Sequence, residues 1–142
     1  MPGIFRLSPD LIVKDAEELL RTGVMGVLLF GIARRKDASA SDASSQEGAM
    51  QSAARALRQK FGKKILIITD VCLCGFTDHG HCGILKGRTI DRKKTLEALG
   101  RIAVTHAQAG ADFVAPSAMT RGQVRAVRTA MDRAGYEKTK IW

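Results

Sequence analysis

The sequence has few aromatic residues and no long apolar run, and both absences exclude classes of protein. One Trp and one Tyr among 142 residues leave no aromatic platform on which bases could stack, so we expect no nucleic-acid partner. No apolar stretch reaches the roughly 18 residues that a membrane helix needs. Residues 1–6 also lack the basic start and apolar core of a secretory signal. The sequence therefore predicts a cytoplasmic protein with no membrane partner.

The net charge of +9 has two interpretations. Lys and Arg are scattered along the chain, which indicates a solvated basic surface. Alternatively, the excess positive charge belongs to an incomplete chain whose acidic partners lie elsewhere.

Apolar segments that fit buried parallel strands alternate with amphipathic helices. The strands are predicted to begin near residues 24, 64, 112 and 138, and the first apolar run covers residues 24–32. Residues 36–52 are polar and predict a long loop. Helices are predicted at four places: from Ser8 to Gly23, up to about Phe61, from Asp91 to Gly110, and along a face marked by Val124, Val127 and Met131.

This alternation predicts an α/β fold, either a doubly wound sheet or a (β/α)8 barrel. No Gly-x-Gly-x-x-Gly follows a predicted strand, so the dinucleotide-binding form of the open sheet has no support. A barrel needs eight βα units and about 250 residues, and this chain supplies about four units. We treat residues 1–142 as a single domain, best defined over 1–35 and 64–142.

The three cysteines are Cys72, Cys74 and Cys82, and they lie within eleven residues. An odd number so closely spaced is a poor disulfide framework and a good metal site, and thiolates suit Zn²⁺. Three ligands leave one position open, as in zinc sites that act on a bound molecule. The cluster follows a predicted strand, where α/β folds place their active sites. The competing interpretation is that Cys72 and Cys74 are simply buried thiols.

Two histidines share the glycine-rich loop with the cysteines. His79 or His81 could supply a fourth ligand or hydrogen-bond to the site, and simple solvent exposure is the alternative. His106 lies in an Ala-rich helix and is interpreted as a packed or surface histidine.

The loop resembles a known family. Asp-Val-Cys-Leu-Cys at residues 70–74 and Thr-Asp-His-Gly-His-Cys-Gly at residues 77–83 are similar to the metal-binding signature of zinc-type porphobilinogen synthases, also called 5-aminolevulinate dehydratases. Other segments of the chain also resemble the family and occur in the same order as in the family. They lie at residues 1–8, 27–32, 36–37, 115–117 and 122–124. The resemblance spans essentially the whole chain and implies a partial (β/α)8 TIM barrel, about four units of eight.

The resemblance implies an enzyme of haem biosynthesis, which condenses two 5-aminolevulinate molecules into porphobilinogen with the loss of two waters. Cys72, Cys74 and Cys82 match the ligands of a Zn²⁺ ion that helps bind and polarise the second substrate. Asp70 and Ser117 match positions that line the active site. The family assembles as a homo-octamer.

The resemblance also implies that no catalytic residue is present here. The family's two Schiff-base lysines are expected beyond Trp142, and Lys138 and Lys140 match neither. Ala118 and Arg121 stand where the family usually has Asp.

Three hypotheses follow. The chain is a porphobilinogen synthase fragment, inactive alone; or one half of a split enzyme whose partner chain supplies both lysines; or a stand-alone zinc-thiolate binding or redox module on a half barrel, which would need cysteines of lowered pKa.

Overall fold

The structure is a computed structural model that describes residues 5–142; the first four residues of the family-like segment 1–8 lie outside the described residues. Its main feature is a four-stranded parallel sheet formed by β1 (Gly26–Leu29), β2 (Leu66–Val71), β5 (Phe113–Pro116) and β6 (Lys140–Ile141). The strands lie in chain order, β1-β2-β5-β6, and each neighbouring pair is parallel. A doubly wound sheet reverses its strand order at a switch point, whereas a barrel does not. The topology is therefore that of a barrel segment, which confirms the predicted fold class.

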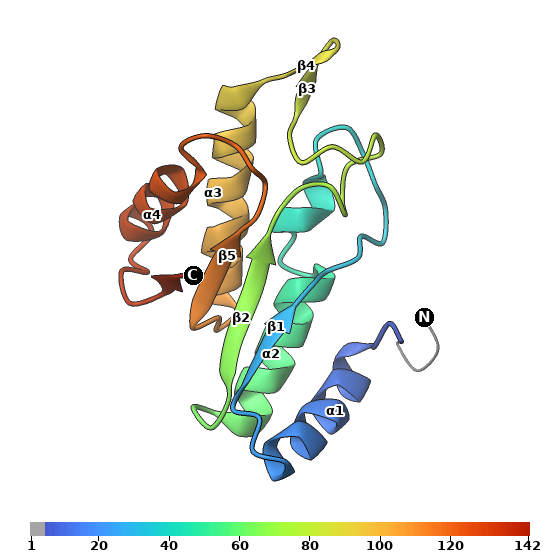
Figure 1. Ribbon diagram of the computed structural model, residues 1–142, viewed down its shortest axis with the longest axis vertical. Coiled ribbons are helices and arrows are strands. Elements are labelled where there is room, and N and C mark those ends of the chain that lie inside the picture. The colour runs from blue at the N-terminus through green and yellow to red at the C-terminus, as the bar shows by residue number, and fades with distance from the viewer. Residues whose placement is uncertain (1–4) are drawn as a thin grey trace.

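Four α-helices accompany the strands: α1 (Pro9–Arg21), α2 (Ala49–Phe61), α3 (Arg92–Gln108) and α4 (Gln123–Arg133). Figure 1 shows the strands in front of α2 and α3, with α4 beside α3 and α1 beside α2. Asp91 caps α3 as predicted, because its carboxylate accepts a hydrogen bond from the Lys94 amide. No helix within residues 5–142 is long and apolar enough to cross a membrane.

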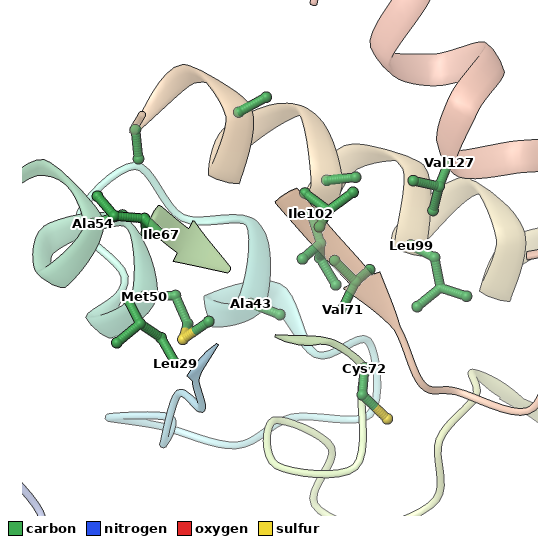
Figure 2. Packing of buried hydrophobic residues seen from close by; sticks show 14 of the residues in the cluster. Leu29, Ala43, Met50, Ala54, Ile67, Val71, Cys72, Leu99, Ile102 and Val127 are labelled. Carbon is green, nitrogen blue, oxygen red and sulfur yellow. The ribbon is translucent and has the colours of Figure 1, made fainter. Parts of the chain in front are cut away.

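The two faces of the sheet differ in burial. In β2, Ile67, Thr69 and Val71 are fully buried against the helices. On the other face Leu66 is 47% exposed and Ile68 is 8% exposed, so that face is less completely covered. Alternation of this kind follows from the two-residue period of a strand. Figure 2 shows the buried side, where Ile67 and Val71 lie in one cluster with side chains from the helices.

Part of the segment predicted as a polar loop is helical. A short 3-10 helix, η1 (Ser41–Ser44), lies within residues 36–52, and α2 already begins at Ala49. The carboxylate of Asp37 accepts hydrogen bonds from the amides of Ser39 and Ser41, which fixes the turn before η1. Ala43 is buried, so this polar stretch is held by packing as well.

Three further details differ from the sequence predictions. The strand predicted at residues 24–32 is shorter than expected and is confined to β1. In α4, Val124 is 55% exposed, so of the three residues predicted to mark its buried face only Val127 and Met131 do so. A hairpin of β3 (Leu85–Lys86) and β4 (Thr89–Ile90) follows the cysteine loop and was not predicted. Its strands are too short to show an alternating pattern.

Candidate metal centre at the carboxyl ends of the strands

The cysteine loop begins where β2 ends, so Cys72 directly follows the last strand residue, Val71. Leu73 and Thr77 are fully buried and anchor the loop. The Leu73 carbonyl accepts a hydrogen bond from the Thr77 amide at 2.9 Å, and the Thr77 hydroxyl donates to the His81 carbonyl at 3.0 Å. These two contacts turn the chain back on itself and return Cys82 to the first two cysteines.

The three thiol groups form one cluster. The Sγ atoms of Cys72 and Cys74 are 3.5 Å apart, and the three sulfurs all lie within 4.8 Å of one another. Tetrahedral zinc with Zn–S bonds of about 2.3 Å requires sulfurs about 3.8 Å apart. The cluster therefore fits one thiolate-bound metal ion after small side-chain movements, and its soft donors match zinc better than magnesium or calcium.

Burial raises the pKa of two of these thiols, those of Cys74 and Cys82. Removal from water, together with the neighbouring sulfurs of Cys72 and Cys74, raises the pKa of Cys82 to about 12. Burial also raises the pKa of Cys74. Without a bound metal ion, thiols of raised pKa are poor nucleophiles. A metal ion would displace their protons and hold the sulfurs as thiolates.

The two loop histidines interact with each other rather than with the sulfurs. The His81 amide donates to His79 Nδ1 at 3.2 Å, and His81 Nδ1 lies 3.0 Å from the His79 carbonyl oxygen. Within residues 5–142 the group of potential ligand atoms contains the three cysteines and neither histidine. His79 Nε2 is buried without a hydrogen-bond partner in the described part of the chain.

Asp70 and Ser117 lie side by side next to the cluster. Asp70 occupies the carboxyl end of β2 and pairs in register with Ala115 of β5, two residues before Ser117. The Ser117 hydroxyl donates to Asp70 Oδ1 at 2.5 Å. Burial raises the pKa of Asp70, and the hydrogen bond from Ser117 opposes that effect. Because Asp70 is also two residues from Cys72, the carboxyl group and the thiol cluster share one edge of the sheet.

The family resemblance singled out residues 27–32 and 36–37 but gave them no role, and the structure places Gly31 and Asp37 in the segment that supports the loop. The Asp37 amide donates to the Phe76 carbonyl, and the Asp78 amide donates to the Asp37 carbonyl, both at 3.3 Å. A Cβ atom on Gly31 would lie 2.4 Å from Met50 Cγ and 3.0 Å from the Phe76 ring. Gly31 therefore lets the chain after β1 pass closely under the cysteine loop, and this glycine was the available signal.

A barrel segment with a thiol cluster at the carboxyl ends of its strands defines part of a β/α-barrel protein with a candidate metal site on the face where such barrels place their active sites. Comparison with known proteins gives the family: the sequence model of delta-aminolevulinic acid dehydratase matches residues 1–142. The chain belongs to this family, as its sequence resemblance indicated.

Individual relatives support the same family. Curated proteins named delta-aminolevulinic acid dehydratase from Archaeoglobus fulgidus and Escherichia coli are 45% and 40% identical over 141 residues, 99% of this chain. The chain covers 44% and 43% of those proteins, and 68% of a Ruminiclostridium josui relative that is 41% identical. It thus spans less than half the length of most of the relatives compared.

A solved structure shows the same fold. The Toxoplasma gondii delta-aminolevulinic acid dehydratase (porphobilinogen synthase), crystallised in complex with the reaction product porphobilinogen, superimposes with a TM-score of 0.93 at 32% sequence identity. The match covers 99% of this chain and 41% of the other.

Proposed function

We propose that this chain provides the zinc-binding part of a porphobilinogen synthase active site, where two 5-aminolevulinate molecules condense to porphobilinogen. The observation that carries the proposal is the cluster of Cys72, Cys74 and Cys82 beside Asp70, in a chain whose family match includes every residue. The Toxoplasma relative, solved with porphobilinogen bound, supports the same substrate class.

The chain's own residues have distinct tasks in this proposal. Cys72, Cys74 and Cys82 hold Zn²⁺, which when bound supplies a Lewis acid for the second substrate. Ser117 fixes the Asp70 carboxyl group through Oδ1. Asp70 Oδ2 has no hydrogen-bond partner among residues 5–142 and is free to accept a hydrogen bond from a substrate amino group.

In this proposal, Schiff-base formation uses two lysines that the family resemblance does not match to any lysine of residues 1–142. By family resemblance both lie beyond Trp142, so we expect the 142-residue polypeptide to bind zinc without turning over substrate. The exposed side chains of Leu28, Leu66 and Trp142 indicate where further barrel strands would pack.

Two finer expectations accompany the proposal. Three free cysteines that bind metal need a reducing compartment, which supports a cytoplasmic location. The homo-octameric assembly implied by the family stays a prediction.

The test uses the purified 142-residue chain. We expect one zinc per chain by elemental analysis, no 5-aminolevulinate turnover, and no adduct after borohydride reduction. Co-expression with the complementary carboxyl-terminal segment of the Archaeoglobus relative, which is 45% identical over the matched part, should restore turnover. Turnover by the chain alone would contradict the missing-lysine proposal, and absence of bound zinc would contradict the assigned metal site.

A further inference from the structure

A long groove runs between α3 and α4, on the helical layer and away from the strand ends. It has a volume of about 1060 Å³, and a second hollow of about 480 Å³ continues it along α3, sharing Glu97, Gly100 and Ala130. Figure 1 shows the two helices side by side. They pack closely because Gly100 has no side chain: a Cβ there would lie 2.9 Å from Ala130 Cβ. We call these two hollows together the α3–α4 groove.

The rim of the α3–α4 groove is strongly basic. Among the described residues, Glu97 is the one acidic residue that lines it. Arg128 is occupied by Asp132 and by the carbonyls of Tyr136 and Thr139. The remaining cations form no ion pair within residues 5–142. The basic residues lining the larger hollow are Arg92, Lys93, Arg121, Arg125, Arg128 and Arg133.

The floor of the groove is apolar. Leu96, Gly100, Ala126 and Ala130 line it, and Val124 is 55% exposed at one end. Along α3 the lining residues run from Arg92 to Thr105, a distance of about 20 Å at 1.5 Å per residue. That length matches three to four turns of a docked helix.

We propose that the α3–α4 groove docks an acidic amphipathic helix of a partner protein. The apolar floor would receive the partner's apolar stripe, and the basic rim would pair with its carboxylates, as in other helix-in-groove complexes. A nucleic acid fits less well, because no aromatic side chain from the described part of the chain lines the groove, and bases would have nothing to stack on. A second copy of this chain fits less well too, because each copy carries a net charge of +9.

The probe is a fluorescein-labelled 16-residue peptide. Leu occupies positions with the spacing i, i+3, i+4 and i+7, which form one face of a helix, and Glu occupies most other positions. Its binding is followed by fluorescence anisotropy at 50 and 300 mM salt. A peptide of the same composition in scrambled order measures binding by charge alone. We expect the patterned peptide to bind at least tenfold tighter than the scrambled one, with an affinity that falls as salt rises.

The variants locate the site. The double variant Arg125→Glu/Arg133→Glu should weaken binding at least tenfold, and Val124→Asp should weaken it through the floor. Lys60→Glu/Lys64→Glu, with the same change of charge at exposed positions elsewhere, should change affinity less than twofold. Circular dichroism and zinc content should be unchanged in all three, so failure here is distinct from failure at the metal site.

Three outcomes would overturn the proposal. These are equal weakening by the two double variants, equal affinity for the patterned and scrambled peptides, or displacement of the peptide by single-stranded DNA at equal charge concentration. The last outcome would indicate a nucleic-acid surface.

Discussion

Ser117 donates its hydroxyl proton to Asp70 Oδ1 at 2.5 Å, joining two residues that are 47 positions apart in the sequence. The bond links the carboxyl ends of β2 and β5. The Ser117 amide adds a second link, because it donates to the Val71 carbonyl at 3.2 Å. The contact between the two parallel strands thus fixes the carboxyl group of Asp70, which lies two residues before Cys72 of the candidate metal site.

The first prediction concerns the energy of this contact. Ser117→Ala and Asp70→Ala should each destabilise the protein, and a double-mutant cycle should show a coupling of about 1.5–3 kcal/mol, the usual range for a hydrogen bond to a charged group. Urea unfolding of the four proteins measures it. Strictly additive losses would show that the two side chains do not interact.

The second prediction concerns the cysteine cluster. Cys72→Ser, Cys74→Ser and Cys82→Ser should each lower zinc affinity at least 100-fold, because a hard hydroxyl replaces a soft thiolate. Competition with a chromophoric chelator measures the affinity, and cobalt substitution shows the loss of thiolate charge-transfer bands. His81→Ala is the matched control in the same loop and should retain affinity within about threefold. A loss in His81→Ala as large as in the cysteine variants would make His81 a ligand.

The sequence predicts features formed by residues that are close along the chain, but it does not predict contacts between residues that are far apart along the chain. Cys72, Cys74 and Cys82 lie within one loop, so their spacing alone predicts a metal site before any fold is known. Asp70 and Ser117 lie on different strands, and only the family resemblance singled them out. Their contact depends on the register between β2 and β5, which no local pattern encodes.

The wrong prediction of a loop at residues 36–52 also results from contacts that a local pattern does not encode. Residues 36–52 are polar and Ser-rich, so composition predicted a loop, but Ala43 is buried in the fold and η1 forms around it. The Gln51 side chain is also buried, donating to the Ala43 carbonyl at 3.0 Å and to Thr105 Oγ1 at 2.8 Å. Long-range contacts of this kind override local propensity, which is why α2 begins earlier than its sequence suggested.

The third prediction concerns Asp112, which holds the amino-terminal ends of β2 and β5 together. Its carboxylate pairs with Arg58 and Lys63 and accepts a hydrogen bond from the Ile67 amide at 2.9 Å. Burial alone would raise its pKa, but these donors outweigh burial and hold the pKa of Asp112 below its ordinary value. Asp112→Asn leaves the half-buried Arg58 without a counter-charge and should cost about 3 kcal/mol of unfolding free energy.

A second ion pair provides the control for Asp112. Arg128 and Asp132 are four residues apart on α4, and the Asp132 side chain is 46% exposed. Asp132→Asn should therefore cost less than about 1 kcal/mol. Chemical denaturation of both variants at pH 7 measures the two changes in unfolding free energy. Similar losses of unfolding free energy at the two sites would refute the assigned role of Asp112.

The last prediction concerns the pH dependence of stability. His106 is 1% exposed within α3, and neither ring nitrogen has a hydrogen-bond partner among residues 5–142. Burial lowers the pKa of His106 from 6.5 to about 4. The unfolded chain therefore takes up a proton at higher pH than the folded chain does. Stability is complete above about pH 6.5 and is lost as pH falls toward 4.

Between pH 7 and pH 5 this difference should remove about 2 kcal/mol of unfolding free energy. His106→Leu places an apolar side chain of similar size in the same position, so it should leave stability at pH 7 equal or higher. Because leucine does not titrate, the variant should keep most of that stability at pH 5. Urea unfolding of both proteins at the two pH values gives the four free energies needed. If wild type and variant lose the same amount on acidification, another group causes the pH dependence and the buried imidazole does not.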